Sequence, residues 1–353
     1  MLSLLDDPAR LTTFDPSDML GYLHRLPEVA EPAFRRARAV ALPLSRPRQV
    51  VVCGMGGSAI SGDLARNLVF AHSEVPVVVS RHNGLGASVS PEDLVILLSY
   101  SGNTAETLGC LEDAIARKIP CVLVTSGGKF GALAEEHGLA TVRVESGWMP
   151  RAALGELYFS LLGLISQLPG CAWISPEAAV RQLRLERETY GLEVPIESNP
   201  AKRVASKLAG KRPVIFGVHP STEAVAMRWK AQINENSKMT ALMGVFPELT
   251  HNEIVNLAHS RHEDHVMVVL RDPSDHPFLQ RQLGFARDIM APMLDEVIEL
   301  AGAGEDPLSR QLSLAYLGDW VSVYLALMAG VDPTPVEAIF GLKDRMALTQ
   351  EVR

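Results

Sequence analysis

Short runs of aliphatic and β-branched residues alternate with helical patterns along this chain. In the first half, the apolar runs are 49–53, 77–80, 94–98, 121–125 and 141–144. The stretches between them, such as 58–70 and 104–118, carry apolar residues three or four positions apart, which predicts amphipathic helices. Strands that alternate with helices form a parallel sheet covered by helices on both faces, so we predict an α/β fold.

A second series of the same kind follows, with predicted strands at 214–217, 238–245, 265–270 and 296–299. Before it, 155–168 and 176–190 are predicted helices joined by Pro169 and Gly170. A chain of 353 residues is long enough for two domains of about 150 residues each. We therefore predict two α-β-α sandwich subdomains with mainly parallel sheets. The predicted boundaries are a helical lead-in over 1–44, subdomains over 45–168 and 200–353, and a helical linker over 169–199.

Charge and cysteine usage exclude several classes of protein. The chain has 33 Lys and Arg against 41 Asp and Glu, a net charge of −8, so neither a nucleic-acid nor a membrane-surface partner is expected. Its four cysteines have no C-x-x-C spacing, which argues against a zinc site or a disulfide framework. Because the N-terminus does not resemble a signal peptide and no long apolar segment occurs, we predict a cytoplasmic protein.

The first strand runs into a glycine-rich loop, Gly54-Met55-Gly56-Gly57-Ser58, that opens a helix. A helix start offers unpaired N–H groups and a positive dipole end, and glycine lets an anion approach the backbone. Ser58 adds a hydroxyl donor and is a candidate N-cap. Two other interpretations stay open: a tight strand-to-helix turn without a ligand, and an NADP site that uses Gly54, Gly56 and Ala59 together with Arg81.

The third strand favours a phosphate over a dinucleotide, because it runs into a second polar loop, 99–107. Ser99, Ser101 and Thr104 come from a strand end, a loop and a helix start, and can converge on the oxygens of one phosphate group. Two anion-adapted loops at the carboxyl ends of parallel strands are more specific than either loop alone.

The second half supplies groups for proton transfer. Glu235 ends a long helical pattern, and His251 follows sixteen residues later. A carboxylate and an imidazole are a plausible general base and ring-opening acid, although each is also common on a protein surface. Arg151 follows a strand and a turn, where a guanidinium stabilises developing negative charge or simply pairs with a carboxylate. Lys343 lies on a predicted short helix near the end of the chain, where surface lysines are the usual case.

Together these motifs resemble the bifunctional phosphoglucose/phosphomannose isomerase family, whose sugar-isomerase (SIS) domains bind phosphorylated sugars. The resemblance rests on 54–63, 99–107, 150–155, 234–238, 251–253 and 332–343, in that order along the chain. It implies that Glu235 moves a proton between C1 and C2, that His251 and Lys343 assist ring opening, and that Arg151 stabilises the enediolate. It further implies substrate binding by Gly56, Gly57, Ser58, Ser99, Ser101, Thr104 and Thr334, the last as a specificity residue, with no metal and no cofactor.

The resemblance also implies a homodimer in which His251 acts in the neighbouring subunit's site. The predicted partner is a phosphosugar, and the predicted reaction interconverts glucose 6-phosphate and mannose 6-phosphate with fructose 6-phosphate through a cis-enediol. Three alternatives are weaker. A non-catalytic sugar-phosphate sensor has no need for four catalytic groups, an NADP-dependent oxidoreductase leaves the second loop unexplained, and an amidotransferase-linked isomerase lobe lacks its N-terminal cysteine.

Overall fold

The computed structural model describes residues 2–350 and contains two parallel sheets. In the first, β1 lies between β2 and β3, and the strand order is β2-β1-β3-β4-β5. β1, β3 and β4 are buried throughout, as expected for a sheet with helices on both faces. The strands are β1 (Val50–Cys53), β2 (Val77–Ser80), β3 (Leu94–Leu98), β4 (Cys121–Thr125) and β5 (Ala140–Arg143).

The second sheet has four strands in the order β7-β6-β8-β9, all parallel. Its first three strands repeat the arrangement of the first sheet, because β6 lies between the next strand along the chain and the one after that. Two α/β halves with parallel sheets are thus confirmed. The strands are β6 (Arg212–Val218), β7 (Leu242–Phe246), β8 (His262–Arg271) and β9 (Leu294–Ala301).

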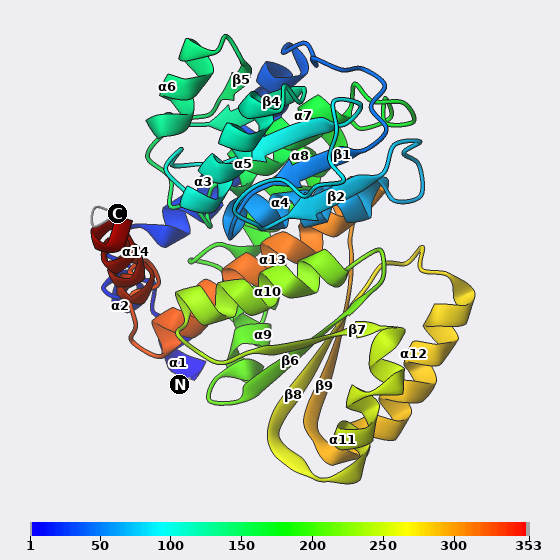
Figure 1. Ribbon diagram of the computed structural model, residues 1–353. Coiled ribbons are helices and arrows are strands. Elements are labelled where there is room, and N and C mark those ends of the chain that lie inside the picture. Colours follow the sequence, from blue (N-terminus) through cyan, green and yellow to red (C-terminus); the bar gives the residue numbers. More distant parts are fainter. Residues whose placement is uncertain (1, 351–353) are drawn as a thin grey trace.

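Long helices fill the space between the two sheets (Figure 1). One large apolar core joins the inner faces of both sheets to these helices, and smaller cores lie under the outer helices of each sheet. The inner helices are α3 (Met19–Arg38), α4 (Gly57–Val69), α7 (Leu154–Ile165), α8 (Glu177–Tyr190), α9 (Pro200–Leu208), α10 (Glu223–Asn236) and α13 (Pro307–Met328). The outer helices are α5 (Ala105–Ala116), α6 (Gly128–Glu136), α11 (Glu253–His259) and α12 (Pro277–Met290).

The remaining elements lie at the two ends of the chain and in short connections. α1 (Leu2–Leu5) and α2 (Pro8–Thr12) are the first helices of the chain, and α14 (Glu337–Gln350) is the last. Two 3-10 turns, η1 (Glu248–His251) and η2 (Ala291–Met293), follow β7 and α12. Within residues 2–350, no helix combines the length and the apolar character needed to cross a membrane.

Most predicted elements agree with the structure to within a few residues, and one differs for a clear reason. The strand predicted over 238–245 begins only at Leu242. Lys238 has a positive φ of 55°, which ends α10 and is incompatible with a strand, and its ammonium group bonds to three carbonyl oxygens around the helix end. The predicted domain boundaries stay predictions, and their outer limits, 1 and 353, lie outside the described residues.

Candidate active site

A cavity of about 150 Å³ lies where the first turn of α4 meets the last turns of α10. It therefore joins the carboxyl edge of the first sheet to a helix of the second half. Both halves and the 150–151 segment contribute to its lining, which consists of Gly56, Gly57, Ile60, Arg81, Arg151, Met227, Arg228, Ala231, Gln232 and Glu235.

The glycine loop lets α4 come close to the segment that carries Arg151. Gly56 has a φ of 52°, in the left-handed region, and serves as the N-cap of α4. A Cβ on Gly57 would lie 2.7 Å from the carbonyl oxygen of Pro150, so no other residue fits there without moving the backbone. The expectation that Ser58 caps the helix is wrong, since α4 already begins at Gly57. Ser58 is buried in the first turn.

Arg151 is held at the junction of the two halves. Its Nε donates to Asn236 Oδ1 at 2.6 Å, and its Nη2 donates to the carbonyl oxygens of Pro333 and Thr334 at 2.6 and 2.8 Å. Burial lowers the pKa of this guanidinium, whereas Glu235 and Asp332 oppose that shift. Because an arginine stays protonated in proteins, a fixed positive charge faces the cavity.

Glu235 lies beside that charge, with its Oε2 4.0 Å from Arg151 Nη1. Its side chain is 31% exposed, so the carboxylate is reachable from outside. Lys238 donates to the carbonyl oxygens of Glu235 and Pro333 and thereby fixes the end of α10 against the 333–334 segment. A reachable carboxylate next to a buried, rigidly held guanidinium is suited to proton abstraction with charge stabilisation.

The second polar loop lies next to the first because β1 and β3 are neighbours in the sheet. A Cβ on Gly54 would lie 3.2 Å from the carbonyl oxygen of Leu98, which shows how close the two loop starts are. Ser99 Oγ donates to Thr104 Oγ1 at 3.3 Å, and Ser101 Oγ accepts from the N–H of Asn103. Thr104 occupies the N-cap position of α5 without a capping hydrogen bond, so its hydroxyl is not committed to the helix.

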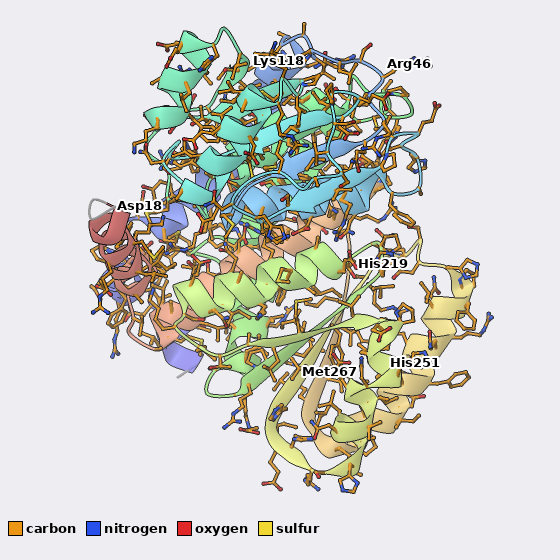
Figure 2. The ribbon with its side chains drawn as sticks, viewed as in Figure 1. Asp18, Arg46, Lys118, His219, His251 and Met267 are labelled. Atoms are coloured by element: carbon orange, nitrogen blue, oxygen red, sulfur yellow. The ribbon has the colours of Figure 1, made fainter. Side chains whose placement is uncertain are left out.

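His251 does not reach Glu235 within one chain. α10 runs antiparallel to the strands, so its last turn, with Glu235, lies at the amino edge of the second sheet. His251 follows the carboxyl end of β7, a five-residue strand that is roughly 16 Å long. Figure 2 shows His251 beside α11, away from the end of α10 that approaches α14 in Figure 1. The structure thus separates these two predicted catalytic residues.

Thr334 lies at the site, but Lys343 does not contact it. Besides accepting from Arg151, Thr334 has a buried hydroxyl with no hydrogen-bond partner among the described residues. Lys343 is exposed on α14, almost two turns after the helix begins. The bonds of Arg151 to Pro333 and Thr334 anchor the segment that leads into this helix next to the cavity.

Two residues of the cavity were missed in the sequence, Arg228 and Gln232. Together with Glu235 they occupy positions four and three residues apart, which places them on one face of α10. A polar stripe at that spacing, on a helix whose other buried positions are apolar except for Asn236, was the available signal. Arg81, considered above for a nucleotide phosphate, also lines the cavity and is paired with Asp63.

Possible metal ligands and cysteines were considered in the part of the chain that the structure describes. No cluster of three or more His, Cys, Asp or Glu side chains there is placed to hold a metal ion. The four cysteines are free and buried.

Comparisons with known proteins point to one family. A family model described as the bacterial phospho-glucose isomerase C-terminal SIS domain matches residues 197–346, and the SIS domain model matches residues 43–143. The bifunctional phosphoglucose/phosphomannose isomerase of Caldicellulosiruptor bescii is 39% identical over 93% of this chain and 99% of its own length. The protein of the same name from Aquifex aeolicus is 34% identical over 87% of this chain and 93% of its own.

A solved structure agrees on the fold alone. A hypothetical protein from Thermus thermophilus superposes with a TM-score of 0.75 over 99% of this chain and 94% of its own, at 19% identity.

Proposed function

Because this chain belongs to the bifunctional phosphoglucose/phosphomannose isomerase family, we propose that it interconverts glucose 6-phosphate and mannose 6-phosphate with fructose 6-phosphate. The observation that carries the proposal is the pairing of Glu235 with Arg151 in a cavity that also contains the glycine loop of the first sheet. Neither a sensor nor an oxidoreductase needs that pair. The predicted cytoplasmic location stays a prediction.

In the proposed reaction, Glu235 takes the proton from C2 of the aldose and returns it to C1. The proton is only weakly acidic, so its removal needs a positive charge close to the oxygen on which negative charge develops. Arg151 supplies that charge, and its bonds to Asn236, Pro333 and Thr334 keep it in place. Rotation of the cis-enediol would present its other face to Glu235 and yield the epimer at C2.

The phosphate group is proposed to bind outside the small cavity, at the two loops of the first sheet. A volume of about 150 Å³ is less than the usual 300–1,000 Å³ of a small-molecule pocket, so it accommodates only the reacting end of the sugar. The N–H groups at the start of α4, with Gly56, Gly57 and Ser58, and the hydroxyls of Ser99, Ser101 and Thr104 suit a phosphate. Thr334, whose carbonyl oxygen accepts from Arg151, is proposed to contact the sugar as the specificity residue.

His251 is proposed to act in the active site of a second copy of the chain. Next to it, α11 and α12 pack together and expose large apolar side chains, namely Val255, Phe278, Phe285 and Ile289, which are 53–70% exposed. Exposed apolar surface of this kind is typical of a protein interface. Lys343 is proposed to assist the same ring-opening step, which requires α14 to bring it towards the cavity.

The function is tested by offering the purified protein fructose 6-phosphate with a chelator present and following glucose 6-phosphate and mannose 6-phosphate separately. Both products are expected. Glucose 6-phosphate alone would restrict the activity to phosphoglucose isomerase and argue against Thr334 as the specificity residue. Neither product, with the phosphosugar still raising the melting temperature, would favour a sensor.

The role of Glu235 has a sharper test. Glu235→Gln removes the base with little change in volume, so turnover is expected to disappear while fructose 6-phosphate still binds. Loss of binding with unchanged turnover per bound substrate would reject this role.

The role of His251 across subunits is tested by mixing Glu235→Gln with His251→Asn, each inactive alone. If subunits exchange, half of the dimers are mixed and each mixed dimer has one intact site, so about a quarter of the activity returns. Suppose that no activity returns although a mass measurement confirms that the subunits have exchanged. His251 would then act in the site of its own subunit, or take no part in the reaction.

A further inference from the structure

Arg228 is a buried charged residue in the cavity to which no function has yet been given. It is 2% exposed and lines the cavity together with Gln232 and Glu235, from the same face of α10. The nearest part of the chain on the other side is the segment of Arg151, whose carbonyl oxygen accepts from Arg228 Nη2 at 3.2 Å. Two guanidinium groups, from Arg151 and Arg228, are therefore brought to one small space beside a single reachable carboxylate.

The guanidinium of Arg228 is held by a buried acid on α13. Asp319, fully buried, accepts from Arg228 Nη2 at 2.7 Å with one oxygen and from Gln232 Nε2 at 2.9 Å with the other. Burial raises the pKa of Asp319, and the contact with Arg228 opposes that shift. Asp319 thus fixes the side chains of two cavity residues at once.

Both hydrogen bonds described for the guanidinium of Arg228 come from its Nη2. Its Nε is buried and has no hydrogen-bond partner among the described residues. Buried donors of charged groups are nearly always paired, and an unpaired one calls for an explanation such as a ligand that completes it. A purely structural ion pair would not need to line the cavity, as Arg228 does.

We propose that Arg228 is a second substrate-binding guanidinium of the active site, which donates to an oxygen of the sugar that enters the cavity beside Glu235. This rests on the proposed isomerase function. Arg151 and Arg228 then act together on the negative charge that forms when Glu235 removes the proton. Asp319 and Gln232 are positioning residues, because they hold Arg228 and touch no substrate.

The test compares Arg228→Lys with Arg310→Lys. Arg310 is the control, because it too pairs with a buried aspartate, Asp272, although its own side chain is 14% exposed and it lies at the carboxyl edge of the second sheet, away from the cavity. We measure kcat and KM for fructose 6-phosphate, the melting temperature, and the affinity for 5-phosphoarabinonate, whose carboxylate copies the enediolate. Inorganic phosphate serves as a probe for the phosphate loops alone.

For Arg228→Lys we expect kcat to fall by about 100-fold or more, as when one donor to a developing oxyanion is removed. Affinity for 5-phosphoarabinonate should fall in the same proportion as kcat/KM, while the affinity for inorganic phosphate stays the same. Arg310→Lys should lower the melting temperature and leave kcat unchanged. A lower melting temperature with unchanged kcat and analogue affinity for Arg228→Lys would overturn the proposal.

A second variant covers the case in which Arg228→Lys does not fold. The double variant Arg228→Gln with Asp319→Asn removes both buried charges together and leaves neither unpaired. Wild-type kcat in this variant would also overturn the proposal, and a comparable loss would support it. Turnover by the wild-type enzyme separates the two hypotheses, because its absence rejects the isomerase function itself.

Discussion

The carboxyl edges of the two sheets have the same topology and opposite chemistry. In the first sheet, the loops after β1 and β3 offer hydroxyls that bond to one another or to the backbone, as Ser99 does with Thr104. In the second sheet, the loops after β6 and β8 hold the corresponding hydroxyls with carboxylates. Ser221 donates to Asp275, and Ser274 donates to Asp272 at 2.6 Å.

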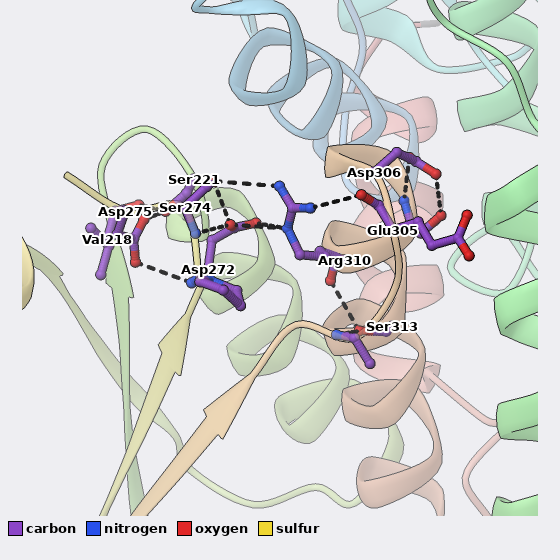
Figure 3. A network of polar contacts seen from close by, with 12 residues as sticks. Val218, Ser221, Asp272, Ser274, Asp275, Glu305, Asp306, Arg310 and Ser313 are labelled. Carbon is purple, nitrogen blue, oxygen red and sulfur yellow. Dashed lines mark hydrogen bonds and ion pairs between the residues drawn. The ribbon is translucent and has the colours of Figure 1, made fainter. Parts of the chain in front are cut away.

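Figure 3 shows how the second edge is closed. Asp275 also accepts from the N–H of Asp272, and Asp272 accepts from Arg310 Nε at 3.0 Å, which ties the loop to the start of α13. A phosphate at this edge would meet two buried carboxylates in place of free donors.

The difference teaches that the fold alone does not make a binding site. The switch point of a parallel sheet offers a crevice, and the loop residues decide whether its donors stay available. We accordingly propose that the phosphate of the substrate binds at the first edge and that the second edge contributes to stability.

The largest expected effect comes from placing an acid at the first edge, which should make this edge resemble the second one. Ser101→Asp adds a negative charge to an exposed loop position next to the proposed phosphate. Two unit charges about 4 Å apart near a protein surface repel by about 4 kcal/mol, so KM for fructose 6-phosphate should rise by about 1,000-fold. Steady-state kinetics measures it.

The neutral variant Ser101→Asn is the matched control for size, and its KM should change far less. Ser221→Ala removes a hydroxyl from the second edge and should leave KM unchanged. Equal KM values for Ser101→Asp and Ser101→Asn would mean that the phosphate does not bind at this loop.

Opening the second edge should affect folding instead of substrate binding. Asp272→Asn leaves the partly buried guanidinium of Arg310 without its charge partner, and removing one member of a largely buried pair costs about 3 kcal/mol. The free energy of unfolding, measured with urea, should fall by that amount with no change in KM. A tenfold change in KM at unchanged stability would instead assign a substrate role to this edge.

Local sequence patterns were enough to predict the first edge, but not the contacts between the halves. β1 and β3 are apolar runs that end in polar loops, so the alternation of apolar strands and polar loops shows where each strand ends. The cavity depends on how α10 packs on α4, and this packing brings Arg228 and Gln232 to Gly57 from far along the chain. The polar spacing of these residues on α10 is visible in the sequence, but the part of the chain that they face is known only from the tertiary structure.

The position of His251 shows a second limit of the sequence, which is that residues close along the chain can lie far apart in the fold. His251 follows Glu235 by sixteen residues, and the resemblance to the isomerase family implied that it acts in the neighbouring subunit's site. The intervening strand, β7, runs from one edge of the sheet to the other, so Glu235 and His251 lie at opposite edges. The separation of His251 from Glu235 within one chain follows from the direction of β7, and the sequence pattern did not show that β7 begins only at Leu242, after the positive φ of Lys238.

The smallest expected effect concerns the charge of Asp275. Burial raises the pKa of this carboxyl group, and the hydrogen bonds from Ser221 and from the N–H of Asp272 only partly oppose the shift. A carboxyl group whose pKa is higher in the folded than in the unfolded protein binds its proton more tightly when folded. Stability therefore falls as pH rises from the unfolded-state pKa through the folded-state pKa, and the ionised group lowers stability at neutral pH.

Asp275→Asn keeps an oxygen that accepts from Ser221 and removes the charge. At pH 7 the melting temperature should rise by about 1–2 °C, and the gain should shrink as pH falls towards about 3.9, the pKa of an unfolded aspartate. Thermal melts over that range measure it, with KM as a second readout that should not change. A lower melting temperature that is independent of pH would mean that the second edge needs the carboxylate as a hydrogen-bond acceptor. The contrast with the first edge would then rest on hydrogen-bond geometry rather than on ionisation.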